Sequence, residues 1–483
     1  MNIKTNSKKV KKRDIFIALK GDKYDGHDYI KEAISNGASK IICENCDFDF
    51  PCLVVQNTHE YLKNYVYNKY YKKIKDIKLI GITGTNGKTT SCFLVYQMLL
   101  KLKVKCAYIG TIGFYIDKKI RDLDNTTPDL VTMYELLLEC RKNNVEYVVM
   151  EVSSHALKKE RLYGLKFDVV AFTNLTQDHL DFHKNMIDYL NSKRKLFDMT
   201  FDNSVSVVNI DDDYSKFFLK DNTITMGFNN SSYQILSYKL YLNKTTYKFR
   251  YNNKVYNVKI QLPGKYNIYN SMLAIIIINN IGFKLNKILK TISKINSPKG
   301  RSEVIQYGSN YIIVDYAHTP DAIKNILNSV CEFKKSKVYT IVGCGGNRDK
   351  SKRSGMGEIA TNLSDYVIFT NDNRRFEDPY KIVDDIVSDL SKDNYEIILD
   401  SNESLIATWS HPIYVKGEGE VQVQSLKVGD ILIDKNNNEI RIKEINNRKT
   451  IDKPVYEIWV ENNRNYFVGN DSILVYSERE IVE

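Results

Sequence analysis

The loop between a short apolar run and a long helix-like stretch constrains this chain most, and it reads Gly84-Thr85-Asn86-Gly87-Lys88-Thr89-Thr90. Glycines let such a loop fold tightly, so that several backbone N–H groups point at one cluster of phosphate oxygens. Lys88 can then reach the terminal phosphates, and the Thr89 hydroxyl can take one coordination position of a Mg²⁺ ion. The strict phosphate-loop spacing is not met, because Ile82 stands where its first glycine should be. An ordinary glycine turn is the alternative, but Lys-Thr-Thr at a strand-to-helix junction favours triphosphate binding.

The chain of 483 residues divides into four segments. The first, residues 1–75, has the pattern of a small α/β unit. Residues 76–297 carry the phosphate loop, and residues 298–406 form a third α/β pattern. Repeated strand–loop–helix alternation predicts a mostly parallel sheet with helices on both faces. Near residue 400 the pattern changes to short alternating strands broken by Gly and Asn turns, which predicts an all-β module over residues 407–483.

Composition excludes several classes of protein. With 43% hydrophobic and 27% charged residues, the chain is neither disordered nor a disulfide scaffold. No apolar stretch approaches the about 20 residues of a membrane span, and no apolar signal core follows the basic start, so we expect a soluble cytoplasmic protein. The net charge of +11 could attract nucleic acid, an anionic membrane or small acidic substrates. The densest basic run, Lys8 to Arg13, lacks interleaved aromatic residues, so neither nucleic acid nor a membrane is expected as a partner.

The eight cysteines are scattered along the sequence. Cys43-x-x-Cys46 is a lone pair, because no second pair and no histidine follows it at the spacing of metal ligands. We therefore expect reduced, partly buried thiols rather than a zinc site or disulfides.

Five further motifs follow the phosphate loop: Asn125-Thr126-Thr127-Pro128, residues 151–157 (EVSSHAL), 174–183 (NLTQDHLDFH), 315–322 (DYAHTPDA) and 343–350 (GCGGNRDK). With the loop, they resemble the Mur ligase family of ATP-dependent amide-bond synthetases over about residues 1–406. The whole set is similar to the branch that adds the third residue of the peptidoglycan stem peptide, since sister ligases and folylpolyglutamate synthase share the loop but not this whole set. The resemblance implies an α/β fold of three domains: a UDP-binding domain, a central ATP-binding domain and a truncated Rossmann-like C-terminal domain.

The chemistry of such a ligase explains several of these residues. Joining a carboxylate to an amine with ATP requires an acyl phosphate, and a divalent metal with cationic side chains lets the two anions approach. Glu151 ends a strand-like run, where ligands bind to parallel sheets, and would form a first Mg²⁺ site with Thr89. The resemblance implies that His179 and a carbamylated Lys193 hold a second ion, and that Lys88, His179 and Lys193 are catalytic. A solvated surface lysine is the alternative for Lys193.

The resemblance also implies contacts to the two large substrates. Around ATP it places the loop residues together with Asn267, Asn270, Arg301 and His318. For UDP-MurNAc-L-Ala-D-Glu it implies contacts from Ser7, Thr126, Thr127, Ser153, His155, Lys159 and Arg161. Lys159 stands where relatives carry Gln, so this contact departs from the family pattern.

The element Asp372-Asn373-Arg374-Arg375 occupies the place of the family's Asp-Asn-Pro-Arg sequence. We take Asp372, Asn373 and Arg375 as amino-acid-binding residues. An Arg here can pair bidentately with the extra carboxylate of meso-diaminopimelate, so this amino acid is expected rather than L-lysine. An unspecific surface charge is the alternative for Arg375.

The last segment departs from the family. The Gly-Lys-Gly-His-Glu-like loop that completes a Mur ligase is absent, and Thr408-x-x-His411, residues 425–430 and residues 465–469 resemble the second half of a Hint (intein/hedgehog-type) domain. No first half precedes them and the end lacks His-Asn, so active splicing is not expected. Three hypotheses remain: a monomeric ligase, an inactive nucleotide- and UDP-sugar-binding protein, and an autoprocessing precursor.

Overall fold

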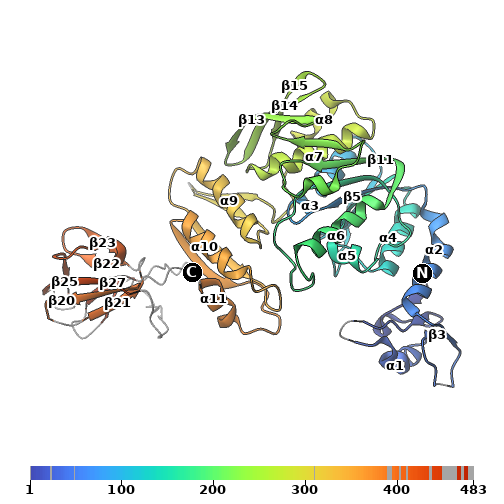
Figure 1. Cartoon of the computed structure of the whole chain (residues 1–483), viewed down its shortest axis with the longest axis horizontal. Helices are drawn as coiled ribbons and strands as arrows, with labels where there is room; N and C mark the ends of the chain where they lie inside the picture. The colour runs from blue at the N-terminus through green and yellow to red at the C-terminus, as the bar shows by residue number, and fades with distance from the viewer. Residues whose placement is uncertain are drawn as a thin grey trace. The chain divides into compact units, whose positions relative to one another are not determined.

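The computed structural model describes residues 2–21, 24–47, 49–308, 310–388, 394–401, 404–408, 412–433, 438–448, 465–468 and 473–476. The chain forms two compact units, Met1–Asp385 and Ile386–Glu483, whose elements are labelled in Figure 1. The first unit has α/β structure and the second contains an antiparallel sheet. No helix in the described ranges has both the length and the apolar composition needed to cross a membrane.

The N-terminal part of the first unit is a four-stranded parallel sheet. Successive side chains of a strand point to opposite faces. Phe16 and Ile41 therefore pack with Ala33 in one small core, whereas Ile17 and Ile42 pack in another that includes the next long helix. The elements are β1 (Ile3–Lys4), η1 (Ser7–Lys9), β2 (Ile15–Ile17), η2 (Gly26–Tyr29), α1 (Ile30–Ser35), β3 (Lys40–Cys43), β4 (Cys52–Val54) and α2 (Thr58–Ile74).

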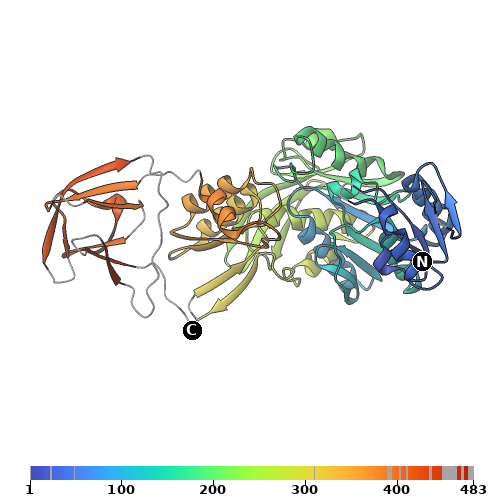
Figure 2. The same cartoon turned by 90° about the horizontal axis from the view of Figure 1, so that it is seen from below.

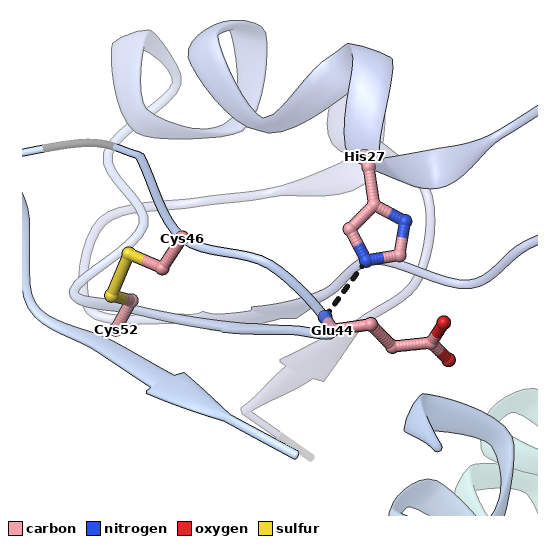
Figure 3. Close-up of a disulfide and its surroundings, with 4 residues drawn as sticks. All are labelled: His27, Glu44, Cys46 and Cys52. Carbon is pink, nitrogen blue, oxygen red and sulfur yellow. Dashed lines mark hydrogen bonds between the residues drawn. A yellow bond between two sulfur atoms is a disulfide. The ribbon is translucent and has the colours of Figure 1, made fainter. Parts of the chain in front are cut away.

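A disulfide joins Cys46 to Cys52 in this part, as Figure 3 shows. The expectation that the thiols are all reduced is therefore wrong for this pair, while the other six cysteines are free. Strand pairing explains the difference: Cys52 opens β4 opposite Ile41 of β3, so the chain returns beside the loop that carries Cys46. The partner of Cys46 lies outside the Cys43-x-x-Cys46 pattern, and the motif by itself could not reveal it.

A Cys46→Ser variant of the oxidised protein is expected to lose about 2 kcal/mol of unfolding free energy, because the cross-link closes a short loop in the unfolded chain. Urea denaturation in oxidising and reducing buffers measures this loss. Reducing agent should destabilise the wild type by the same amount and leave the variant unchanged. Cys331→Ser, at a half-buried free cysteine, is the control. Equal stability of the wild type in both buffers would contradict the prediction.

An eleven-stranded sheet occupies the middle of the first unit, in the order β15-β14-β13-β12-β11-β10-β5-β9-β6-β7-β8. Its strands from β12 to β6 pair in parallel. The strands are β5 (Lys78–Thr83), β6 (Cys106–Gly110), β7 (Gly113–Ile116), β8 (Lys118–Arg121), β9 (Tyr147–Glu151), β10 (Phe167–Phe172), β11 (Thr200–Asn209), β12 (Ile224–Gly227), β13 (Tyr233–Tyr241), β14 (Lys244–Tyr251) and β15 (Lys254–Ile260).

Helices cover both faces of this sheet, as the alternation in sequence predicts (Figure 1). In β5, Leu79 packs with α4 and α6, whereas Ile80 and Ile82 belong to the core that holds α3, α7 and α8. The helices are α3 (Lys88–Lys101), α4 (Leu130–Lys142), α5 (Ser154–Lys158), α6 (Met186–Asp198), α7 (Tyr266–Asn280) and α8 (Leu285–Ile292). The phosphate loop, Glu151 and Thr173 follow or end the neighbouring strands β5, β9 and β10, so they lie at one edge of the sheet.

The remainder of the first unit contains a hairpin and a small α/β layer. The hairpin of β16 (Glu303–Tyr307) and β17 (Asn310–Val314) is the gold pair of arrows in Figure 2. Strands β18 and β19 pair in parallel, with Tyr339 opposite Tyr366. The other elements are α9 (Pro320–Phe333), β18 (Tyr339–Cys344), α10 (Arg353–Leu363), β19 (Tyr366–Asn371) and α11 (Pro379–Val387), the last ending just past the boundary between the units.

The second unit holds a sheet in the order β21-β20-β25-β24-β22-β27-β26, with β23 beside β22. Ile413 and Val415 are buried while Tyr414 between them is half-buried, as alternating strands require. The strand at 394–399, which lies in the predicted third α/β segment, pairs here with β25 on one side and with the strand at 404–408 on the other. The described strands are β20 (Asn394–Leu399), β21 (Ser404–Thr408), β22 (Pro412–Val415), β23 (Gly419–Gln422), β24 (Ile431–Ile433), β25 (Glu439–Arg448), β26 (Asn465–Val468) and β27 (Ile473–Tyr476).

The small antiparallel sheet agrees with the all-β pattern of the last segment. His411 of the Thr408-x-x-His411 motif lies outside the described residues, and so do residues 455–460 and Ser477. The structure therefore establishes a sheet here and leaves the Hint-like interpretation a prediction from sequence.

Candidate active site

A cavity of about 820 Å³ opens at the carboxyl edge of the central sheet. Most of the residues nominated from sequence line it: Thr85, Asn86, Gly87, Lys88, Thr89, Thr90, Thr126, Glu151, Ser153, His179, Asn270, Arg301, His318, Asp372, Asn373 and Arg375. The lining thus brings together the phosphate loop, the nominated metal ligands Glu151 and His179, and the amino-acid element of residues 372–375. All of these residues belong to the first unit.

Close packing explains the glycines of the phosphate loop. A Cβ on Gly84 would lie 1.8 Å from the Thr173 hydroxyl oxygen, and one on Gly87 would lie 2.3 Å from Oδ1 of Asn270. Both glycines also have positive φ values, 149° and 84°, which side chains disfavour. The backbone of Asn86 is held in turn, because its N–H donates to the side-chain oxygen of Asn174 at 2.8 Å. These contacts keep the loop in one conformation beneath the cavity.

Two lysines converge on a single carbonyl oxygen of this loop. Lys88 Nζ donates to the Gly84 oxygen at 2.9 Å, and Lys193 Nζ, from α6, donates to the same oxygen at 2.7 Å. Lys193 is only 1% exposed and its Nζ lies 4.4 Å from the ring centre of Tyr189. Burial, and then the neighbouring Lys88, hold the pKa of Lys193 well below its usual range. Burial also lowers the pKa of Lys88.

Glu151 is completely buried at the end of β9. Its Oε2 accepts a hydrogen bond from the Thr89 hydroxyl at 2.8 Å, and its Oε1 accepts one from the Thr111 N–H at 2.8 Å. Within the described part of the chain, every hydrogen-bond partner of this carboxylate is a hydroxyl or a backbone N–H and none is a cation. A buried carboxylate without a cationic partner, next to a threonine hydroxyl on a cavity, fits a divalent metal ion.

His179 reaches the same cavity from the segment after β10. Its backbone is left-handed, with φ 56°, and its Nε2 lies 3.5 Å from Oδ2 of Asp178. Burial lowers the pKa of His179 to about 3, and the Asp178 charge only partly opposes this. The imidazole is therefore neutral near pH 7, the form that can ligate a metal. The ring of His155 lies edge-on to it at 4.8 Å and stacks on Phe182.

A buried ion pair that the sequence did not single out joins the central and third segments. Asp178 accepts a hydrogen bond from Lys352 Nζ at 2.9 Å, and His318 Nε2 lies 3.5 Å from its other oxygen. Burial opposes ionisation of Asp178, but the hydrogen bond to His318 and the charges of His179 and Lys352 outweigh it and lower the pKa. Asp178 stands in the 174–183 motif, whereas Lys352 lies two residues beyond the last motif, so no sequence signal pairs them.

Further contacts bring the third segment onto the phosphate loop. Arg301 donates to the Thr89 hydroxyl at 3.2 Å, and its guanidinium lies 4.2 Å from the ring centre of Tyr316. The Asn86 amide donates to Asp321 at 3.1 Å. Arg301 and Asp321 are therefore next to the loop, and His318 lines the same cavity.

Several nominated residues do not line the cavity but support it. The Thr127 hydroxyl donates to the Glu151 carbonyl oxygen at 2.8 Å, and Arg161 donates to the Thr127 carbonyl oxygen at 2.8 Å. Asn267 donates to the Pro263 carbonyl oxygen at 2.7 Å. Lys159 Nζ lies 5.5 Å from the ring centre of Phe182.

Ser7 lies in the N-terminal sheet region, apart from these residues. Its hydroxyl donates to Glu32 at 2.5 Å, and its carbonyl oxygen accepts from the Asn36 amide at 3.0 Å. The side chain is buried, so its nominated contact with a uridine nucleotide requires this hydrogen bond to open.

The amino-acid element forms the far side of the cavity, after β19. The Asp372 N–H donates to the Cys344 carbonyl oxygen at 3.0 Å, and the Asn373 carbonyl oxygen accepts from the Gly346 N–H at 2.8 Å. The Asn373 side chain accepts the Arg375 N–H at 3.1 Å, and Arg375 is left-handed with an exposed side chain. These bonds fix the loop backbone and leave the guanidinium of Arg375 accessible to a ligand.

Comparison with known proteins identifies relatives along most of the chain. Three family models match it in order: "Mur ligase family, catalytic domain" at residues 1–80, "Mur ligase middle domain" at 82–278 and "Mur ligase, glutamate ligase domain" at 300–413. The UDP-N-acetylmuramoyl-L-alanyl-D-glutamate–2,6-diaminopimelate ligase of Clostridium tetani is 40% identical over 447 residues, which cover 88% of this chain and 91% of that protein. The ligase of the same name from Clostridium botulinum is 39% identical, with the same coverage.

A solved structure agrees with these sequence relatives. The structure of a UDP-N-acetylmuramoyl-L-alanyl-D-glutamate–2,6-diaminopimelate ligase superposes with a TM-score of 0.60 and 29% identity, covering 80% of this chain and 82% of that one. The prediction of a three-domain α/β architecture is confirmed by these matches.

Proposed function

This chain belongs to the Mur ligase family, and on that premise we propose that it is an ATP-dependent ligase that joins meso-diaminopimelate to UDP-MurNAc-L-Ala-D-Glu in peptidoglycan biosynthesis. Relatives that carry this activity in their names are about 40% identical over most of the chain. The observation that carries the proposal is the cavity, because phosphate-binding, carboxylate-bearing and amino-acid-selecting residues line it together.

The residues divide the work of acyl-phosphate formation. The N–H groups of the phosphate loop and the Lys88 ammonium hold the phosphates of ATP, and Arg301 lies beside Thr89 to stabilise charge that develops during transfer. Thr89 and Glu151 would hold one Mg²⁺ ion and His179 a second, and the ions would neutralise the repulsion between the γ-phosphate and the substrate carboxylate. The D-Glu carboxylate then attacks the γ-phosphorus and ADP leaves. The amine of the incoming amino acid displaces phosphate from the acyl carbon and forms the amide.

For Lys193 we propose that the side chain is carbamylated in the active protein. Its amine has a lowered pKa, so it is available in the neutral, nucleophilic form. The nitrogen lone pair attacks the carbon of CO₂, the amine loses one proton to solvent, and an N-carboxylate results. This change turns the neutral amine at the Gly84 carbonyl oxygen into an anion, which attracts the neighbouring Lys88 ammonium and adds a metal ligand beside the phosphate loop.

Arg375 supports diaminopimelate as the added amino acid. Its guanidinium is exposed on the cavity, and a fork of N–H donors matches a carboxylate that L-lysine lacks. The family's proline is replaced by Arg374, yet the bond from the Arg375 N–H to the Asn373 side chain holds the turn in its place.

Phosphate release tests the proposed function. Full-length protein with ATP, Mg²⁺ and UDP-MurNAc-L-Ala-D-Glu is expected to release phosphate with meso-diaminopimelate, much less with L-lysine and only slowly with no amine. If turnover with L-lysine equalled turnover with diaminopimelate, the proposal that Arg375 selects the amino acid would be wrong. Absence of turnover, with ATP and the UDP-sugar still bound, would support the inactive binding protein instead.

For the second unit we propose a module fused to the ligase, with the Hint-like motifs of residues 425–430 and 465–469 as its sequence support. The family match ends at residue 413, inside β22, so most of this sheet lies beyond it. Intact mass after expression checks the autoprocessing hypothesis, because a stable 56.0 kDa species would contradict it.

A further inference from the structure

We propose that Tyr108 is a positioning residue for Glu151: its hydroxyl holds one carboxylate oxygen so that the other faces the divalent cation of the phosphate-loop site. The inference rests on the proposed function only in taking Glu151 and Thr89 as cation ligands. Tyr108 belongs to none of the motifs that point to the ligase, and it does not line the cavity.

The sheet brings Tyr108 to Glu151. Strand β6 lies beside β9 in parallel, with Tyr108 opposite Val149. The Tyr108 ring is completely buried in the aromatic cluster on the α3 face, with Phe93 and Tyr115 edge-on at 6.2 and 5.7 Å. From there its hydroxyl donates a short hydrogen bond to Oε1 of Glu151.

The donors around Glu151 fall into two groups. Oε1 accepts from Tyr108, whose ring is completely buried, and from the backbone N–H of Thr111, directly after β6. Oε2 accepts from the hydroxyls of Thr89 and Thr111, at 2.8 and 3.2 Å. A threonine hydroxyl can rotate its proton away and offer a lone pair to a metal, whereas a backbone N–H cannot. Oε1 is therefore committed to the protein, and Oε2 with the Thr89 oxygen is open to a cation.

The contact between Tyr108 and Glu151 is packed tightly against the backbone of Gly110. A Cβ on Gly110 would lie 2.2 Å from Oε1 of Glu151 and 2.3 Å from the Tyr108 hydroxyl oxygen. The glycine lets the phenol and the carboxylate meet against the backbone.

Tyr96 supplies a matched control. It is also completely buried in the same cluster, with its ring centre 6.1 Å from that of Tyr108. Its hydroxyl has no hydrogen-bond partner among the described residues. Tyr96→Phe and Tyr108→Phe therefore remove the same atom from the same core, but only the second change removes a bond to Glu151.

Metal binding to full-length protein tests the proposal without relying on turnover. With ADP present, free Mn²⁺ is measured by electron paramagnetic resonance during titration of wild type and both variants. Tyr108→Phe is expected to weaken Mn²⁺ binding about tenfold, as loss of a bond that orients a ligand does, while Tyr96→Phe stays within about twofold of wild type. ADP binding in EDTA should be equal in all three proteins, which shows that the nucleotide site is intact.

Turnover adds a second readout. In Tyr108→Phe the Mg²⁺ concentration for half-maximal rate should rise by a similar factor, with the rate largely restored at saturating Mg²⁺. Unchanged Mn²⁺ binding in Tyr108→Phe, or the same loss in both variants, would overturn the proposal. If no ligase activity is found while Mn²⁺ binding responds to Tyr108→Phe alone, the proposed function fails and the positioning role stands.

Discussion

Replacing Lys193 with alanine is expected to lower turnover by about a thousandfold, the size of effect seen when a preorganised group at the site of developing charge is removed. The carbamate proposed at Lys193 would be lost, and with it a negative ligand next to the phosphate loop. Nucleotide binding should survive, because the Gly84 carbonyl oxygen keeps its bond from Lys88 and the phosphate loop itself is unchanged. Steady-state phosphate release and calorimetric ADP binding measure the two effects.

The neighbour Lys195 is the control for this variant, since it lies exposed on the same helix α6. Lys195→Ala should leave turnover unchanged. The modification itself is observed by ¹³C NMR of protein equilibrated with ¹³C-bicarbonate, where wild type should show a carbamate signal that Lys193→Ala lacks. Full activity in Lys193→Ala, or the same signal in both proteins, would exclude the proposed role.

Replacing Lys88 with methionine is expected to lower kcat/KM for ATP by two to three orders of magnitude, about the loss for one preorganised electrostatic contact. Methionine keeps most of the stem volume but removes the ammonium that the loop holds through the Gly84 and Thr85 carbonyl oxygens. Unlike the Lys193 variant, this one should also bind ATP more weakly, because Lys88 meets the phosphates in the ground state. Titration of ATP binding together with turnover separates the two lysines.

Lys101, exposed at the end of the same helix α3, provides the comparison. Lys101→Met should bind ATP and turn over as wild type does. If both ATP affinity and turnover were unchanged in Lys88→Met, the proposed role of Lys88 in phosphate binding would be wrong.

Local sequence patterns predicted those features of this protein that depend on residues close together in the sequence. The phosphate loop needs consecutive backbone N–H groups between a strand and a helix, and the structure places it between β5 and α3. The parallel sheet with helices on both faces follows from the alternation of apolar runs. Short alternating runs in the last segment likewise correspond to strands such as β22, β24 and β27.

The sequence does not show which strands pair at the end of the third segment. The strand at 394–399 has an apolar run that suits a parallel sheet as well as an antiparallel one. The structure pairs it with β21 and β25 in the second unit. Period-2 alternation identifies a strand but does not name its neighbour, because pairing partners are chosen by packing at long range.

By itself, the sequence of this protein determined the order of its motifs and the α/β class of its first unit, and it nominated the residues proposed to carry the chemistry of a ligase. Only the tertiary structure decided which side chains meet: Lys193 at the carbonyl oxygen that Lys88 also contacts, Asp178 with Lys352, and Tyr108 with Glu151. The physical reason is that these contacts depend on strand order and burial. Hydrogen bonds between segments far apart in the chain leave no spacing in the sequence that could reveal them.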